Sequence, residues 1–248
     1  MTTARIVGVV LLLSLVSVRP ARACSRIASR SVQNFSTLPL EGSSAPRNTR
    51  LWTVDLPTGE GEFTLVDAQG AQVVLERSTI TINGEQPVNL EILTPVSLLA
   101  PGTWTFSRGA TALSHFTVTA EVDEVAPAAL TPTVGAVEGE YFGAYSCGNP
   151  SLVTLALGAE AEIAIAGTEG QAWQVATALG VATGNTLHVT APPAGEQRLV
   201  VFHVDLAGNA TASEVVTAQV PAQARGCSAG PLVPLGLLAL ALLRRRSR

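Results

Sequence analysis

The chain contains no lysine and only three histidines, three cysteines and one methionine among its 248 residues, and aromatic residues make up 4% of it. The histidines and cysteines show neither the His-x-x-x-His nor the Cys-x-x-Cys spacing of zinc sites. The Gly-x-Ser-x-Gly turn of many serine hydrolases is missing. The glycine-rich stretch 139–143 lacks the lysine of a phosphate-binding loop. We therefore expect no enzyme activity, no metal ion and no cofactor.

Basic charge is also scarce. Nineteen acidic residues stand against fifteen arginines, and seven of these arginines lie in the first 23 or the last five residues. The part between carries the remaining eight arginines and all nineteen acidic residues. Because a nucleic-acid-binding protein needs a basic surface that displaces counterions, we expect no nucleic-acid partner. A negative surface suits an exported protein that must stay soluble.

The first 23 residues have the pattern of a secretory signal peptide. Arg5 precedes the apolar stretch Ile6–Val18, and the small-x-small triplet Ala21-Arg22-Ala23 follows. This pattern predicts cleavage by signal peptidase between Ala23 and Cys24. Two alternatives are a buried N-terminal helix and a lipoprotein signal, in which Cys24 would be the first mature residue. Lipoprotein signals usually carry leucine at the position that alanine occupies here.

Between the two ends the sequence is typical of β-structure. Short alternating runs of Val, Thr, Leu, Ile and Phe are separated by turn residues about every 8–12 residues, and no internal segment keeps an apolar period of 3.6. Asp67-Ala68-Gln69-Gly70 separates two such runs and predicts a hairpin turn. In the second half the predicted strands are 152–157, 162–166, 172–176, 186–190, 199–205 and 214–220. We expect an all-β fold.

The strand pattern is interrupted once, at the Ala-Pro-rich stretch 123–133, which is typical of a semi-rigid linker. We therefore expect an N-terminal segment at 24–45, one β-sandwich domain at 46–122 and a second at 134–221. The run 199–205 is apolar enough to be a central strand of the second domain.

Three motifs carry a resemblance to known surface proteins. Pro46-Arg47-Asn48 stands before a predicted strand, and Leu99-Ala100-Pro101-Gly102-Thr103-Trp104-Thr105-Phe106 ends the same half. This pair resembles the entry and exit of bacterial Ig-like surface domains of the SbsA type. Val204-Asp205-Leu206-Ala207-Gly208-Asn209 resembles the last hairpin of other bacterial Ig-like or fibronectin-type repeats. The resemblance implies two Ig-like or fibronectin-III-like β-sandwich domains in tandem.

The last segment, 222–248, contains Gly226-Cys227-Ser228, the apolar run Leu232–Leu243 and Arg244-Arg245-Arg246. This order resembles the myxobacterial C-terminal sorting tag, known as MYXO-CTERM. The resemblance implies that a membrane-embedded sorting protease cuts near the cysteine, that Cys227 is lipidated, and that the product is held on the cell surface or outer membrane.

The physical properties of this tail are consistent with processing. Its twelve apolar residues would form a helix of roughly 18 Å, whereas a bilayer core is about 30 Å thick. The arginine block would stay cytoplasmic under the positive-inside tendency. The short hydrophobic sorting helix would thus span the membrane only marginally before processing. The alternatives are a permanent tail anchor and a buried core helix.

This interpretation of the tail also suggests how the three cysteines are used. If the tail uses Cys227, an even pair remains in an oxidising compartment, and we predict a disulfide between Cys24 and Cys147. The alternatives are two free thiols or a lipidated Cys24.

Only a few residues could form a further ligand-binding site. Asp123 and Glu124 near the predicted linker, with Asp205 and Asn209 in a distant turn, could supply oxygen ligands to calcium, although loop carboxylates are usually solvated. The three tryptophans could form a sugar-binding platform, but their positions in strands favour core packing.

We expect an exported, surface-anchored Ig-like protein with a structural, adhesive or partner-binding role. The alternatives are an envelope enzyme or inhibitor, and a maturation factor with an open edge strand.

Overall fold

The computed structural model describes residues 32–33, 35, 37–55, 61–83, 87–139, 151–174 and 177–222. All of the regular structure in these ranges is β-structure, which confirms the predicted all-β class. The first nine strands are β1 Val32–Gln33, β2 Ser44–Ala45, β3 Leu51–Asp55, β4 Phe63–Asp67, β5 Gln72–Val73, β6 Leu75–Ile82, β7 Val88–Pro95, β8 Gly102–Arg108 and β9 Thr111–Val118. The others are β10 Thr133–Glu138, β11 Leu152–Thr168, β12 Thr177–Ala178, β13 Gly180–Thr190, β14 Gly195–Val204, β15 Ala210–Ala212 and β16 Val216–Val220.

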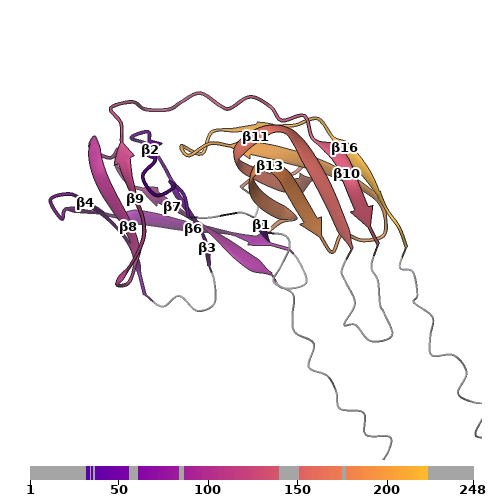
Figure 1. Cartoon of the computed structure of the whole chain (residues 1–248), viewed down its shortest axis with the longest axis horizontal. Coiled ribbons are helices and arrows are strands. Elements are labelled where there is room, and N and C mark those ends of the chain that lie inside the picture. The colour runs from indigo at the N-terminus through magenta and orange to yellow at the C-terminus, as the bar shows by residue number, and fades with distance from the viewer. Residues whose placement is uncertain are drawn as a thin grey trace, which may run out of the picture.

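Two sheets form the first half (Figure 1). One has the strand order β12-β6-β7-β3, and the other has the order β2-β9-β8-β4-β5. Leu51 and Leu93 from the first sheet pack against Leu65, Phe106 and Phe116 from the second. These side chains share a core because alternate residues of a strand point to the same face. The predicted turn after β4 is confirmed, since Gly70 has a φ of +84° and the Asp67 carboxylate accepts hydrogen bonds from the amides of Gln69 and Ala71.

The second half is a seven-stranded sheet with the order β1-β13-β11-β14-β15, in which β10 also pairs with β11 and β16 with β14. Strand β11 has 17 residues and changes partners along its length: residues 152–156 pair with β10, and residues 163–168 pair with β14. Gly158, with a φ of +77°, lies in the irregular middle, where a Cβ atom would come within 2.3 Å of the Thr131 hydroxyl oxygen. The glycine therefore permits the bend that folds the sheet over its own core.

The layer formed by β14 and the second half of β11 is buried on both faces. Leu199, Val201 and the alanines of β11 face one core, together with Ala218 and Val220 of β16. The alternate residues of the same layer face the four-stranded sheet. That second core contains Ile163, Ile165, Val200, Phe202, Val204, Trp52, Ile80, Ile82, Leu90 and Ile92. The predicted central strand at 199–205 is thus confirmed, because it is apolar on both of its faces.

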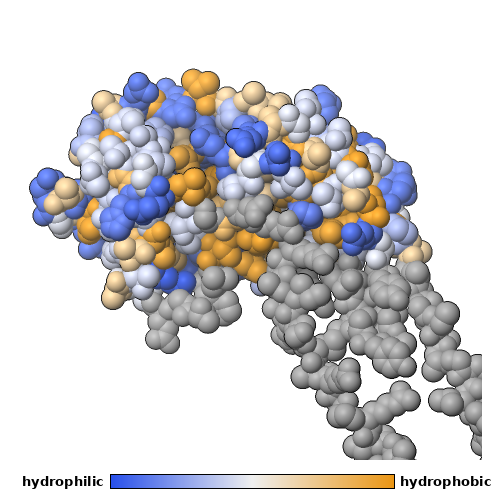
Figure 2. All heavy atoms as spheres, in the orientation of Figure 1, coloured by the Kyte–Doolittle hydropathy of each residue, from blue (hydrophilic) through white to orange (hydrophobic). Residues whose placement is uncertain are grey.

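Short strands also connect the halves. β12 pairs in parallel with residues 81–82 of β6, and β1 pairs in parallel with residues 181–182 of β13. In Figure 2 hydrophobic residues are most concentrated midway along the molecule, where the two halves meet. The sheets therefore form a continuous stack with three cores. The count of two tandem domains and their boundaries stays a prediction.

The segment 123–132, predicted as part of a linker, contains no strand and is attached to both halves. Leu130 is buried in the core of the seven-stranded sheet. The His203 imidazole Nδ1 lies 2.8 Å from the Ala128 carbonyl oxygen. The main chain of Asp123 is held by asparagine side chains from each half.

Candidate binding groove at the sheet junction

The sorting and disulfide residues predicted from the sequence lie outside the described residues. They are Ala23, Cys24, Cys147, Gly226, Cys227, Ser228, Arg244, Arg245 and Arg246. Their roles stay predictions, as does the hydrophobic helix at 232–243. Within the described ranges, no helix has the length and apolarity that a membrane span requires.

The two motifs of the first half bind each other. The amide of Leu99 donates to the Arg47 carbonyl at 2.9 Å, and the Arg47 Nε atom donates to the Leu99 carbonyl at 2.9 Å. The Trp104 indole donates to the Ala100 carbonyl at 2.8 Å. The Arg47 amide donates to the carbonyl of Glu121, which begins the connecting segment. The motifs thus fix the end of the first sandwich that faces the second half.

The motif of the second half, residues 204–209, contacts the same end of the first sandwich. The Asp205 carboxylate accepts hydrogen bonds from the Asn209 amide and from the Asn209 side chain, both at 2.9 Å, and so closes the turn. The Asn209 side chain also donates to the Asp123 carbonyl at 3.1 Å. From the other half, Asn48 donates to the same carbonyl at 2.7 Å and accepts from the Asp123 amide at 2.9 Å.

These contacts bring together three of the four candidate calcium ligands, Asp123, Asp205 and Asn209, but in each case the polar groups are used in hydrogen bonds within the protein. Asp123 contributes its main chain to the two asparagines, and its carboxylate accepts the Val125 amide at 3.1 Å. The Asp205 oxygens accept amide hydrogens from Asn209. The described part of the chain holds no group of three or more His, Cys, Asp or Glu side chains that could hold a metal ion.

Arg50 lies at the centre of this junction. Its amide donates to the Leu206 carbonyl at 2.7 Å, and its guanidinium lies 5.8 Å from the centre of the Trp173 ring. Gly208 also lies against the guanidinium, since a Cβ atom at Gly208 would lie 2.4 Å from the Arg50 Cζ atom. Burial lowers the pKa of Arg50, and attraction to the Asp205 carboxylate raises it in part.

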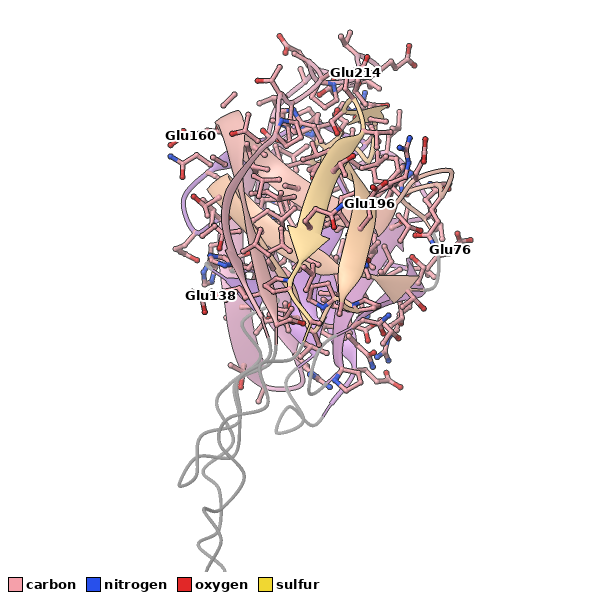
Figure 3. The ribbon with its side chains drawn as sticks, turned by 90° about the vertical axis from the view of Figure 1, so that its right-hand side faces the viewer. Glu76, Glu138, Glu160, Glu196 and Glu214 are labelled. Atoms are coloured by element: carbon pink, nitrogen blue, oxygen red, sulfur yellow. The ribbon has the colours of Figure 1, made fainter. Side chains whose placement is uncertain are left out.

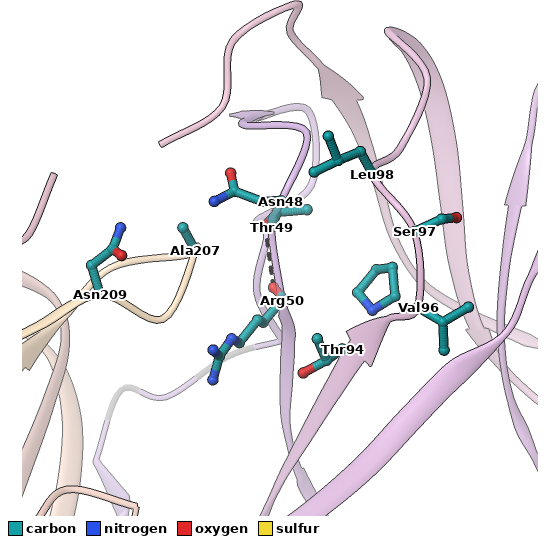
Figure 4. Close-up of a pocket in the computed structure, with 10 residues that line it drawn as sticks. Asn48, Thr49, Arg50, Thr94, Val96, Ser97, Leu98, Ala207 and Asn209 are labelled. Carbon is teal, nitrogen blue, oxygen red and sulfur yellow. Dashed lines mark hydrogen bonds between the residues drawn. The ribbon is translucent and has the colours of Figure 1, made fainter. Parts of the chain in front are cut away.

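A groove of about 450 Å³ runs beside Arg50 (Figure 4). Its floor is residues 48–50, one wall is the end of β7 with the residues that follow it, 94–98, and the opposite wall is Ala207 and Asn209. Val96 and Leu98 are 55% and 51% exposed. The Thr49 hydroxyl donates to the Arg50 carbonyl at 3.2 Å. The groove therefore combines aliphatic side chains with a cation and amide groups.

The tryptophans occupy interior positions, as predicted. Trp52 and Trp104 are buried. Trp173 is partly buried and packs against Trp52 with 5.9 Å between the ring centres. The predicted strand 172–176 is wrong at residues 172–174, which contain no strand and form a turn at 173–174. That turn places the Trp173 ring between Arg50 and Trp52.

A buried carboxylate lies elsewhere, in the central strand β7. Glu91 is 1% exposed and accepts hydrogen bonds from the Arg77 Nε atom at 2.7 Å and the Thr79 hydroxyl at 2.9 Å. Phe63 lies against Arg77 and Arg108 beside it, at 5.7 Å and 5.0 Å from the ring centre. Arg77 and Thr79 belong to β6, the neighbour of β7 in the same sheet, whereas Phe63 belongs to the other sheet, so the contact between Arg77 and Phe63 links the two sheets.

Sequence reasoning did not single out Arg50 or the groove. The available signal was the rarity of cations: after residue 50, the described ranges contain only Arg77, Arg108 and Arg198. A partly buried arginine at the start of a strand is conspicuous against that background, but its contacts come from residues more than a hundred positions away.

No family model matches the chain, and no curated protein is significantly similar to it. Among the solved structures that match is a chain described as "Biofilm associated protein - BSP domain", with 12% sequence identity and a TM-score of 0.25. The alignment covers 75% of this chain and 29% of that one. A likeness of this size carries no argument about function.

Proposed function

We propose that this protein is an exported, cell-surface-anchored β-protein with a non-enzymatic role in structure, adhesion or partner binding. The observation that carries the proposal is the junction groove, which is built on main chain fixed from both halves and combines a cation with exposed aliphatic side chains. Binding surfaces of this kind lose little conformational freedom when a partner docks, because the groove is already ordered.

The architecture supports a role that bears load or holds a partner at a fixed geometry. The four-stranded sheet and the β11–β14 layer share an apolar core, so the two halves cannot rotate independently without exposing it. Several edge strands of the described sheets have only two or three residues, such as β5, β12 and β15. Short edges limit unwanted strand pairing between surface molecules.

The two chain ends support the proposed location. The signal peptide would be removed by signal peptidase after Ala23, and the C-terminal tag would be cut by a sorting protease and lipidated at Cys227. A single lipid chain binds a membrane only marginally, so stable attachment would need a second chain or a second contact. In this proposal the membrane is a partner through the C-terminus.

Antibody staining of intact cells tests this proposal. We expect the unmodified protein to stain intact cells, and we expect the Cys227→Ser variant to lose most of that signal while its total amount stays similar. Ser247→Ala, a change in the same tail outside the three motifs, is the control and should stain normally. Equal staining of the Cys227→Ser variant would refute lipid-linked display, and staining only after permeabilisation would refute surface location.

A further inference from the structure

We propose that the junction groove is a carboxylate-binding site, in which Arg50 receives a carboxylate of an extended partner peptide while Val96 and Leu98 contact its neighbouring aliphatic side chain. This inference rests on the proposed partner-binding role and specifies its chemistry.

The first argument is the state of Arg50. Arg47 donates to a carbonyl, Arg77 pairs with Glu91, and Arg198 pairs with Glu169. The Arg50 guanidinium is half-buried and is attracted to the Asp205 carboxylate, but it makes no hydrogen bond or ion pair with that carboxylate or with any other residue that the structure describes. A partly desolvated cation without a hydrogen-bonding partner is unfavourable. A ligand that supplies acceptors would relieve that cost.

The geometry of the Arg50 guanidinium also suits a carboxylate. A guanidinium offers five N–H donors in a planar fork that matches the two oxygens of a carboxylate. Gly208 and Trp173 contact the Arg50 guanidinium and restrict where it can move. Because the side chain is already held, less rotamer freedom is lost when a carboxylate binds.

The surface charge and the side chains around the groove favour a particular kind of ligand. The chain is acidic, and glutamates such as Glu138, Glu160, Glu196 and Glu214 are spread over the surface of the second half (Figure 3). This field repels a polyanion but admits a single carboxylate at a local cation. The groove wall formed by residues 94–98 is aliphatic at Pro95, Val96 and Leu98, across the groove floor from the side on which the Arg50 guanidinium lies (Figure 4). The tryptophan rings face other side chains, so an aliphatic peptide fits the wall better than a sugar, which stacks on aromatic faces.

Two-dimensional NMR of the arginine Nε–H groups, recorded on the full chain in detergent micelles, tests the proposal. The probe is the dipeptide acetyl-Val-Leu with a free C-terminal carboxylate. We expect a saturable shift of the Arg50 signal, and we expect the C-terminal amide of the same peptide to bind at least about tenfold more weakly, as the loss of a charge-assisted hydrogen bond implies. The peptide acetyl-Val-Glu-Leu-amide distinguishes a side-chain carboxylate from a chain terminus.

Three substitutions distinguish peptide binding at this groove from a general electrostatic attraction between peptide and protein. Arg50→Gln should abolish saturable binding, and Leu98→Asp should weaken it at least about tenfold by repulsion while leaving Arg50 in place. Arg198→Gln removes a cation that is paired elsewhere and should leave the affinity within about twofold. Circular dichroism checks that each variant is folded.

Three results would overturn the inference: equal binding of acid and amide, unchanged binding by Arg50→Gln, or no saturable shift of the Arg50 signal with any of the peptides. Tighter binding of a galacturonate dimer than of the peptides would also overturn it, in favour of a sugar ligand. None of these results affects the staining of intact cells, so failure of this site and failure of the proposed surface role are distinguishable.

Discussion

At the scale of single residues, the junction depends on a contact that only glycine permits. Gly208 has a φ of +86°, a left-handed conformation that other residues adopt at a cost, and it also lies against the Arg50 guanidinium. Gly170 has nearly the same φ, +82°, but no atom lies within 4 Å of the place where its Cβ would be. The two glycines thus separate backbone strain from the contact with Arg50.

We expect Gly170→Ala to lower the free energy of unfolding by about 1–2 kcal/mol, the cost of the left-handed backbone. Gly208→Ala should lower it by at least about 1 kcal/mol more, because the new methyl group displaces Arg50. Urea unfolding of both variants measures the difference. Equal losses would show that Gly208 does not press against Arg50.

A second residue-scale prediction concerns pH. The pKa of Glu41 is lowered, chiefly because its carboxylate accepts a hydrogen bond from the His115 amide at 2.7 Å, with a smaller contribution from the His115 imidazole. A lowered pKa in the folded state means that this contact stabilises the protein above the ordinary carboxyl pKa and is lost as pH falls through the lowered value.

Carbon-13 NMR of the Glu41 carboxyl during an acid titration should therefore give a pKa below the ordinary 4.5. His115→Ala should keep most of the lowering, because the main donor is a backbone amide that the substitution leaves in place. A return to 4.5 in His115→Ala would mean that the imidazole is the principal cause.

At the scale of elements, the segment 123–132 is held in place by side chains from both halves. Asp123 offers one amide and one carbonyl, and Asn48 binds both of them with a single side chain. Asn209 reaches the same carbonyl from the other half. A side-chain amide can donate and accept at once, which explains why asparagine occupies position 48 in this arrangement.

Asn48→Ala should lower the free energy of unfolding by about 1–3 kcal/mol, because two hydrogen bonds to main-chain groups are lost together. Asn89→Ala is the control, since Asn89 is exposed and accepts from Thr81 at 3.3 Å; its effect should stay within about 0.5 kcal/mol. Similar small effects of both substitutions would show that the hydrogen bonds between Asn48 and the Asp123 main chain contribute little to stability.

The strands show what local sequence can predict. The runs at 63–66, 79–82 and 88–93 alternate clearly, and all three are strands. Two predicted strands, 152–157 and 162–166, are parts of the single long strand β11, because the turn-like Gly158 between them bends the strand without ending it. β10 was not predicted, since its small residues Gly135 and Ala136 give no alternating pattern.

At the scale of the whole molecule, the sequence predicts the class but not the stacking. The motifs at 46–48 and 99–106 belong to the first half and the motif at 204–209 to the second, yet all three converge on one junction. Such convergence depends on long-range packing between Trp52, Phe202 and their neighbours. No local pattern specifies which apolar faces will meet, so the groove could not be predicted from spacing alone.

The predicted disulfide also belongs to this scale. A Cys24–Cys147 bond would close a loop of more than a hundred residues and stabilise the fold by at most about 4–5 kcal/mol in the chain-entropy model. Peptide mapping without reduction should recover the two cysteines in one linked peptide pair. Alkylation of both thiols before reduction would contradict the prediction.

The central claim is that the protein is exported and then anchored by its processed C-terminus. The most direct test is the intact mass, with terminal peptide mapping, of the protein purified from its native envelope. We predict a chain that begins at Cys24 and ends at or near a lipid-modified Cys227. A chain that retains its C-terminus through Arg248 would contradict this account, because the tail would then be a plain anchor and not a sorting tag.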